Sequence, residues 1–211
     1  MTTAQLRDVR SENLNSGGVD GPPVVILLHG YGSNEDDLTG LVSPLEIEGP
    51  WASLRAPVEL GNGGAAWFTI VTPGDPDAEP VVAATDAIWS WIDSNVSPTA
   101  SVVAIGFSQG GLMASQLLRT RPERVRATVI LGGFVLGAPQ PADEVLAGNP
   151  PPVFWGRGDQ DRVIAPVAIA RTAEFLPQHA ALVERVYPGL AHGISADELA
   201  DVRAFLTANG L

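Results

Sequence analysis

Short apolar runs mark the candidate strands of the chain. The run Val24–Leu28 is apolar throughout, which is typical of a strand covered on both faces, as in a parallel α/β sheet. Similar runs predict further strands at 51–56, 101–105, 127–134, 153–155 and 181–187. Residues 5–12 fit a first edge strand.

Helical spacing marks several segments between these strands. In 81–95 apolar side chains recur every three or four positions, which predicts an amphipathic helix. Further helices are expected at 112–119, 166–176 and 197–208, and one should begin near Glu35 with Ser33 or Asn34 as its cap. The predicted loops are 13–21, 61–64, 72–80 and 135–152.

Length and composition limit the possible classes of protein. A chain of 211 residues, 45% of them hydrophobic, suffices for one core, so residues 1–211 are expected to form a single domain. The sequence has no cysteine, which excludes disulfides and thiolate metal sites. It shows no signal-peptide pattern and no apolar run of membrane-spanning length, so a cytoplasmic protein is expected.

The charge pattern narrows the range of partners. The formal net charge is -12, and all twelve basic residues are arginines. Such an acidic surface repels nucleic-acid phosphates and anionic lipid headgroups. We therefore expect neither nucleic-acid binding nor stable membrane association.

The most informative stretch is Gly106-Phe107-Ser108-Gln109-Gly110, which stands between a predicted strand and a predicted helix. This is the context of a nucleophile elbow, in which a sharp strand-to-helix turn exposes a serine hydroxyl at the carboxyl end of the sheet. The first amides of the helix would then lie beside an oxyanion formed by attack of Ser108. The alternative is an ordinary turn rich in glycine and serine.

A serine nucleophile needs a base, and the chain has three histidines. His192 follows the last predicted strand in a glycine-flanked loop and is the best candidate. His29 is interpreted as a structural residue that bonds to loop backbone, and His179 as a surface residue.

Two aspartates, Asp159 and Asp161, compete for the role of the orienting acid. Both follow a predicted strand. The order along the chain, Ser108, then Asp161, then His192, matches the Ser…Asp…His order of α/β hydrolases. One of them could instead only stabilise a turn. The loop His29-Gly30-Tyr31-Gly32 offers free backbone amides near Ser108, while Trp67-Phe68 fits a pocket or the core equally well.

Four stretches together resemble the phospholipase/carboxylesterase family, small α/β hydrolases that include the acyl-protein thioesterases. They are Leu28–Gly32, Gly106–Gly111, Gly158–Ile164 and Ala191–Gly193. The resemblance spans about residues 22–208. It implies an α/β-hydrolase fold, a three-layer sandwich with a mostly parallel central sheet, and the chain length leaves no room for a sizeable cap domain.

The resemblance also implies a role for each candidate residue. Ser108 would be the nucleophile, His192 the base and Asp161 the acid, because the second aspartate of the family's G-D-x-D pattern is the triad member. The amides of Tyr31 and Gln109 would form the oxyanion hole.

A further family signature, Ala66-Trp67-Phe68, implies that Trp67 and Phe68 lie near the substrate. Phe134, Leu136 and Ile194 are candidates for the acyl pocket or for a homodimer interface.

Two positions depart from the family pattern. Arg157 replaces the histidine that many members carry before the glycine of the acid loop. Tyr31 stands where the thioesterases usually have leucine, and its larger side chain could narrow the acyl site.

The predicted function is that of a serine carboxylesterase that hydrolyses small to medium-chain esters through an acyl-enzyme intermediate, without metal or cofactor. An ester or thioester small molecule would be its substrate. The alternatives are an acyl-protein thioesterase, a lysophospholipase, or a non-catalytic protein that binds a ligand on a hydrolase fold.

Overall fold

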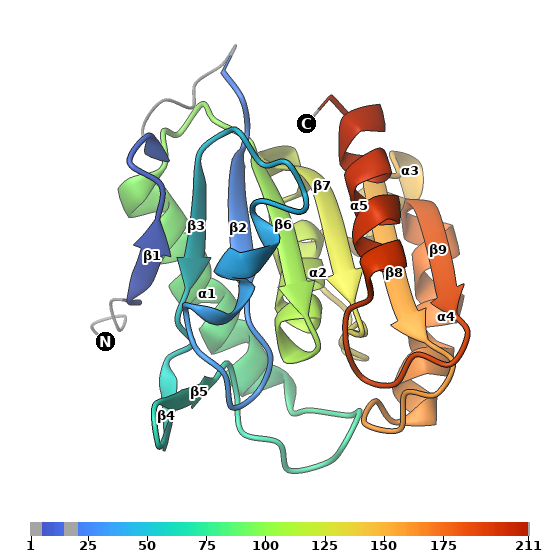
Figure 1. Cartoon of the computed structure of the whole chain (residues 1–211). Coiled ribbons are helices and arrows are strands. Elements are labelled where there is room, and N and C mark those ends of the chain that lie inside the picture. Colours follow the sequence, from blue (N-terminus) through green and yellow to red (C-terminus); the bar gives the residue numbers. More distant parts are fainter. Residues whose placement is uncertain (1–5, 15–20, 211) are drawn as a thin grey trace.

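The computed structural model describes residues 6–14 and 21–210, and it is built on a continuous seven-stranded sheet (Figure 1). The strand order is β1-β3-β2-β6-β7-β8-β9, with β1 antiparallel to β3 and the other pairs parallel. The bounds are β1 Asp8–Arg10, β2 Val24–Leu28, β3 Trp51–Leu54, β6 Val102–Phe107, β7 Val125–Leu131, β8 Pro152–Gly158 and β9 Ala181–Tyr187. Residue 5 of the predicted edge strand and residues 15–20 of the predicted loop lie outside the described residues.

Helices cover both faces of the sheet (Figure 1). On one face lie α1 Ala78–Asn95, α2 Gln109–Thr120, α3 Asp143–Gly148 and α4 Pro166–His179. On the other lie α5 Ala196–Ala208 and the short 3₁₀ helix η2 Asp37–Leu41. A second 3₁₀ helix, η3 Pro122–Arg124, leads into β7.

The apolar runs of the strands are explained by the helices that cover both faces of the sheet. Alternate residues of β2 face opposite layers: Val24, Ile26 and Leu28 pack with α1 and α2, whereas Val25 and Leu27 pack toward α5. A strand buried on both faces cannot alternate apolar with polar residues. The predicted α/β-hydrolase architecture, with three layers and a mostly parallel sheet, is confirmed.

Two sequence-based expectations about secondary structure were wrong, and a third was incomplete because it missed a hairpin. The helix expected from Glu35 is only the 3₁₀ helix η2, because the Asn34 side chain accepts a 2.9 Å hydrogen bond from the Asp36 amide in an Asx turn and does not cap a helix. The predicted loop 135–152 contains the short helix α3. The predicted loop 61–64 forms the turn of a hairpin.

That hairpin pairs β4 Val58–Gly61 with β5 Gly64–Ala66. Its turn residues Asn62 and Gly63 have φ values of 50° and 81°. Two successive positive φ angles favour Asn-Gly, the usual sequence of a tight β-turn between antiparallel strands. The hairpin lies beyond the carboxyl ends of the sheet strands, at the end of the molecule where the loops after β2, β6 and β8 also lie (Figure 1).

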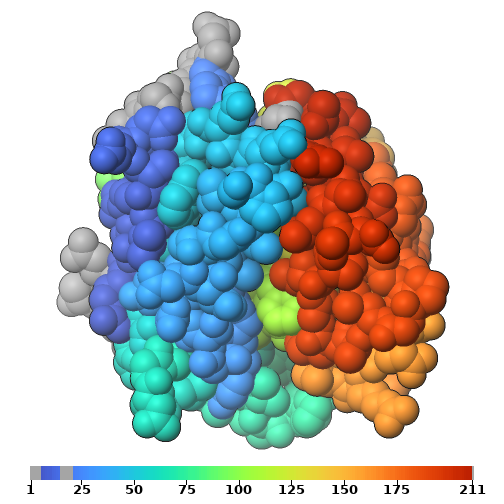
Figure 2. Space-filling model, viewed as in Figure 1, coloured from blue at the N-terminus to red at the C-terminus, as the bar shows by residue number. Residues whose placement is uncertain are grey.

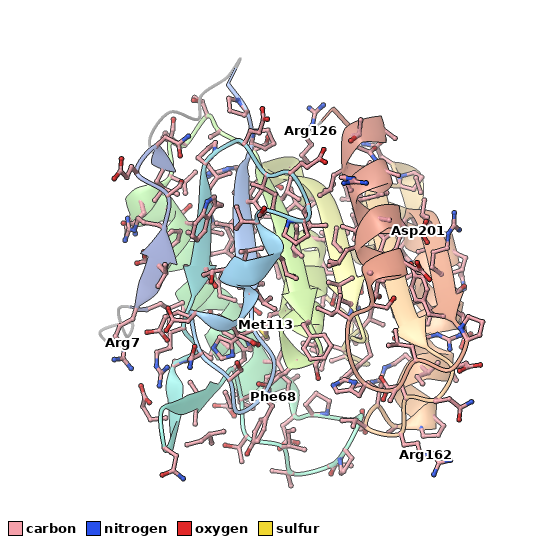
Figure 3. All side chains as sticks on the ribbon, viewed as in Figure 1. Arg7, Phe68, Met113, Arg126, Arg162 and Asp201 are labelled. Atoms are coloured by element: carbon pink, nitrogen blue, oxygen red, sulfur yellow. The ribbon has the colours of Figure 1, made fainter. Side chains whose placement is uncertain are left out.

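Most charged side chains lie at the outside of the molecule, and the buried Arg55 and Arg119 are paired with Glu35 and Asp143. Arg7, Arg126 and Arg162 project from its edges, whereas Met113 of α2 is enclosed (Figure 3). Seen from the α5 side, the N-terminal and C-terminal parts of the chain meet along a furrow through which its middle part is visible (Figure 2). No helix within the described residues is both long and apolar enough to cross a membrane.

One buried carboxyl group departs from this distribution. Glu198, in the first turn of α5, is fully buried against β8, and a Cβ atom on Gly156 would come within 2.1 Å of its Oε1. Burial raises the pKa of Glu198 to about 7, and nearby Asp201 also raises it. Its stabilising effect is therefore full below the ordinary pKa of 4.5 and is lost as the pH rises through about 7.

We expect Glu198→Gln to remove this part of the pH dependence of stability. Between pH 5 and pH 8 the free energy of unfolding of the wild type should fall relative to that of the variant by about 3 kcal/mol. Urea denaturation at a series of pH values measures this difference. Glu144→Gln, at an exposed position of α3, is the control and should run parallel to the wild type; a parallel profile for Glu198→Gln would contradict the prediction.

Candidate active site

Ser108 occupies a sharp turn between β6 and α2. Its backbone angles, φ 56° and ψ -116°, are strained for a residue with a side chain. The flanking glycines are required by space, since a Cβ on Gly106 would lie 2.0 Å from the Gly110 carbonyl oxygen and a Cβ on Gly110 would lie 1.8 Å from that of Leu28. The Gly-x-Ser-x-Gly pattern is thus imposed by the close approach of strand and helix backbones.

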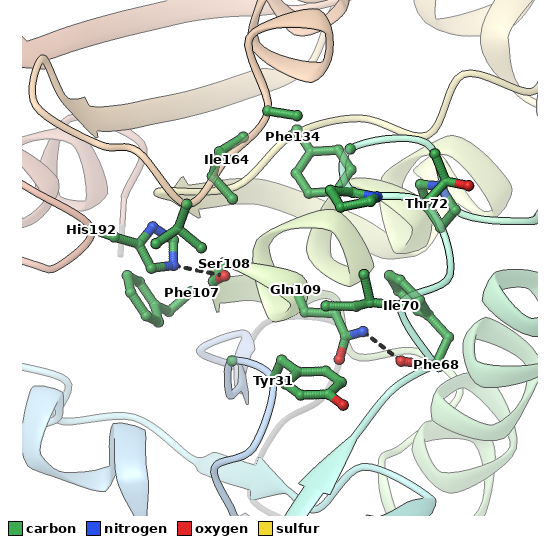
Figure 4. Close-up of a pocket in the computed structure, with 16 residues that line it drawn as sticks. Tyr31, Phe68, Ile70, Thr72, Phe107, Ser108, Gln109, Phe134, Ile164 and His192 are labelled. Carbon is green, nitrogen blue, oxygen red and sulfur yellow. Dashed lines mark hydrogen bonds between the residues drawn. The ribbon is translucent and has the colours of Figure 1, made fainter.

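A chain of hydrogen bonds joins Ser108, His192 and Asp161 (Figure 4 shows the bond to Ser108). The Nε2 atom of His192 lies 2.9 Å from Ser108 Oγ, and its Nδ1 atom lies 2.7 Å from Asp161 Oδ2. Because an ionised carboxylate only accepts hydrogen bonds, the network assigns the imidazole proton to Nδ1. Nε2 is then free to accept the proton of the serine hydroxyl.

The two aspartates of the acid loop have different partners. Besides His192, Asp161 accepts hydrogen bonds from the amides of Val163 at 2.8 Å and Ile164 at 3.2 Å, both at Oδ1. Asp159 instead accepts one from the Gly189 amide at 2.7 Å and so ties the acid loop to the turn after β9. Asp161 is therefore the aspartate that contacts His192, and it also stabilises its own turn, whereas Asp159 holds two loops together.

The other two histidines take no part in this chain of hydrogen bonds. His29 is fully buried, and burial lowers the pKa of its imidazole. Its Nδ1 lies 2.7 Å from the Gly30 carbonyl oxygen, and its Nε2 accepts a 3.1 Å bond from the Ala56 amide, as expected of a structural histidine. His179, at the end of α4, stacks on Phe175.

The expected oxyanion donors, the amides of Tyr31 and Gln109, both belong to residues that line a pocket with Ser108. Within the described part of the chain neither amide donates a hydrogen bond to another protein group. The Gln109 amide is the first of α2, where the helix dipole favours negative charge.

The pocket beside Ser108 has a volume of about 280 Å³ and a largely apolar wall (Figure 4). Phe68 and Phe134 contribute to it, as predicted. Three other predicted pocket residues do not line it: Trp67 is buried behind Phe68, Leu136 lies in the core beneath the helices, and Ile194 packs on the α5 side of the sheet. Leu136 and Ile194 follow their strands in sequence, but the chain turns them into the two cores.

Comparison with known proteins shows which family the chain belongs to. A family model described as Phospholipase/Carboxylesterase matches residues 11–209. The chain belongs to this family. It is accordingly a serine hydrolase of carboxylic esters, the enzyme class that the sequence predicts.

Relatives in the family support the assignment. Acyl-protein thioesterase 1 of Kluyveromyces lactis is 29% identical over 208 residues, covering 87% of this chain and 90% of that protein. Carboxylesterase SOBER1 of Arabidopsis thaliana is 26% identical over 206 residues, covering 86% of this chain and 88% of that protein. The crystal structure of a Bacillus cereus carboxylesterase has a TM-score of 0.76 at 20% identity, with coverage of 98% and 95%, and shows the shared fold.

The two departures from the family pattern take different positions in the structure. Arg157, on β8, donates a 3.3 Å hydrogen bond to Glu184 of the neighbouring strand β9 and lies over the Trp155 ring, and it does not line the pocket. Tyr31 does line the pocket and is 46% exposed at its mouth. Only Tyr31 is therefore placed to affect substrate selection.

The sequence did not identify the remaining pocket wall. Ile70, Thr72 and Gly74 lie in an irregular loop without periodicity, which is fastened from α4 by Arg171 through a 2.5 Å bond to the Gly74 carbonyl oxygen. Val163 and Ile164 stand two and three positions after Asp161, so their proximity to the candidate acid was a usable signal.

Proposed function

We propose that this chain hydrolyses carboxylic esters with small to medium acyl chains through a covalent intermediate on Ser108. The observation that carries the proposal is the hydrogen-bonded chain Ser108–His192–Asp161 at the wall of an apolar pocket of about 280 Å³. A nucleophile, a base and an orienting acid in contact are the parts that acyl transfer needs.

Acylation begins when Ser108 Oγ attacks the substrate carbonyl carbon and His192 Nε2 takes the hydroxyl proton. Asp161 keeps the imidazole in the tautomer with its proton on Nδ1 and stabilises the imidazolium that forms. The amides of Tyr31 and Gln109 donate hydrogen bonds to the oxyanion, and each contributes about 3 kcal/mol to transition-state stabilisation. His192 then gives its proton to the departing alcohol or thiol.

Deacylation repeats these steps with water as the nucleophile. His192 removes a proton from the water as it attacks the acyl carbon, and the tetrahedral intermediate collapses to the free acid and Ser108. The step requires water at the acyl-enzyme, which a pocket open at Tyr31 admits.

The pocket favours substrates of limited acyl length. Its volume lies near the lower end of the range of about 300–1,000 Å³ for small-molecule sites. Phe68, Phe134 and Ile164 provide apolar contacts for an acyl chain, while Tyr31 takes up space at the mouth. A long chain would have to extend past these side chains into solvent.

A thioester is the second candidate substrate. The name of the Kluyveromyces lactis relative, acyl-protein thioesterase 1, favours it. The same nucleophile and base serve both substrates. A thiolate leaves more readily than an alkoxide, so the chemistry accommodates a thioester as well as an ester, and the fit of the group that carries the thiol would decide whether one is used.

Hydrolysis of a p-nitrophenyl ester series from acetate to palmitate tests the proposal. We expect kcat/KM to be highest for chains of two to eight carbons and to fall at least tenfold by palmitate. Ser108→Ala should lower kcat by about 10⁶-fold, as loss of a nucleophile does in other serine hydrolases. A folded wild type without turnover of any ester, or of the matching thioesters, would instead indicate a ligand-binding protein.

The neighbouring aspartates provide a matched pair of variants. Asp161→Asn should lower kcat by about 10³ to 10⁴-fold, because an amide no longer fixes the productive histidine tautomer. Asp159→Asn retains an oxygen that can accept from the Gly189 amide and should keep at least half of the wild-type kcat. The opposite ranking of the two variants, measured with p-nitrophenyl acetate, would assign the acid to Asp159.

A further inference from the structure

We propose that Trp67 is a positioning residue that holds the two oxyanion amides, those of Tyr31 and Gln109, at a fixed separation. The proposal rests on the proposed function, because it assigns Trp67 to the same reaction. Trp67 does not line the pocket, and its effect would be exerted through its hydrogen bonds to Gln109 and His29 and its packing on the His29 ring.

On one side, Trp67 is tied to the start of α2. Its backbone amide donates a 2.9 Å hydrogen bond to the side-chain oxygen of Gln109, and the Gln109 side-chain nitrogen donates a 2.8 Å bond to the Phe68 carbonyl oxygen (Figure 4). The side chain of Gln109 thus forms hydrogen bonds with two successive residues, Trp67 and Phe68, while its backbone amide is one of the two proposed oxyanion donors. Both Gln109 and Trp67 are buried.

On the other side, Trp67 is tied to the loop after β2. Its indole N–H donates a 2.9 Å hydrogen bond to the His29 carbonyl oxygen. The next carbonyl, that of Gly30, accepts a 2.7 Å bond from the His29 imidazole. Two successive carbonyls on the way to Tyr31 are therefore held in place.

The second of these bonds determines where the Tyr31 amide points. The Gly30 carbonyl and the Tyr31 N–H belong to one planar trans peptide, so they point in opposite directions. Fixing the Gly30 oxygen therefore fixes the direction of the Tyr31 N–H. The His29 ring can do this because Trp67 packs against it, with ring centroids 5.5 Å apart, and because its other nitrogen is occupied by the Ala56 amide.

Backbone pairing strengthens the connection. The Gly32 amide bonds to the Ala65 carbonyl oxygen at 2.9 Å, and the Ala65 amide to the Ser33 carbonyl oxygen at 2.8 Å. The loop after β2 is thus joined by an isolated antiparallel bridge, Ser33 with Ala65, to β5, which leads directly into Trp67. A Cβ on Gly30 would lie 3.5 Å from Ser108 Cβ, so the loop packs directly on the nucleophile.

The two amides come from parts of the chain that are far apart in sequence. The contact between Gly110 and Leu28 brings the two segments together, but the Tyr31 amide lies three residues beyond that contact, in the loop after β2. A displacement of about 1 Å in such a site can lower the rate about 10²-fold. The buried bridge from the Gln109 side chain through Trp67 to His29 supplies the missing constraint. Breaking it should affect the transition state, in which the oxyanion exists, more than substrate binding.

Trp67→Phe removes the indole N–H and keeps most of the aromatic packing. We expect kcat for p-nitrophenyl acetate to fall about 10 to 100-fold, with KM changed less than about twofold. Trp89→Phe is the matched control, because Trp89 of α1 is also buried and its indole N–H donates a 2.8 Å bond to Thr120. It should lower the melting temperature to a similar extent and leave kcat within about twofold of the wild type.

A second readout separates positioning from general destabilisation. A trifluoromethyl ketone is attacked by Ser108 Oγ, its carbonyl electrons form an oxyanion and the hydroxyl proton passes to His192. Its inhibition constant should rise in Trp67→Phe by the same factor by which kcat/KM falls. Loss of stability alone does not change this constant in the folded fraction.

The bridge can also be broken from its other end. Gln109→Ala keeps the backbone amide and should lower kcat as well, and the double variant Gln109→Ala, Trp67→Phe should lose less than the product of the two single effects. Wild-type kcat in Trp67→Phe and Gln109→Ala, in an otherwise active enzyme, would overturn the positioning role and leave the proposed function intact. A wild type that hydrolyses no ester or thioester would overturn both.

Discussion

The close approach of the start of α2 to the end of β2 determines the geometry of the site. There is no space for a side-chain atom at Gly110, where a Cβ would lie 1.8 Å from the Leu28 carbonyl oxygen. This contact brings the strained residue Ser108 beside the loop that begins at His29. The proposed nucleophile lies beside the loop that carries the Tyr31 amide because the backbones of β2 and α2 touch. That contact is possible only because the elbow has glycines, which have no side chain to clash.

The sheet brings the other groups of the proposed triad to the same place. Ser108, Asp161 and His192 follow β6, β8 and β9, whose carboxyl ends meet at one edge of a parallel sheet. Gly132, the residue that follows β7, has a φ of 52° and lies against the His192 ring. The sheet, buried on both faces, thus fixes where the loops after β6, β8 and β9 begin. Hydrogen bonds then fix the positions of the Ser108, Asp161 and His192 side chains.

Much of this was predictable from the sequence, and for identifiable reasons. The apolar runs revealed strands covered on both faces, and Gly106, Ser108 and Gly110 lay in the strand-to-helix context that gives the motif its meaning. The hairpin turn at Asn62-Gly63 carried a signal that was overlooked. The pocket wall at Ile70 and Gly74 carried none, because it depends on long-range bonds such as that from Arg171, which no local pattern records.

The position of Trp67 and the role proposed for it show the same limit. The sequence placed it near the site as a pocket residue, whereas the structure places it behind the pocket wall, with its indole on a backbone carbonyl. Such a role arises from contacts between distant segments.

The central claim is that Ser108 is the residue that becomes acylated. Mass spectrometry of the native enzyme after reaction with a fluorophosphonate tests it most directly, since the reagent marks the activated nucleophile by displacement of fluoride. We expect one adduct per chain, on Ser108 within the tryptic peptide 56–119 that Arg55 and Arg119 delimit. An adduct on another residue, or none on a folded chain, would contradict the claim.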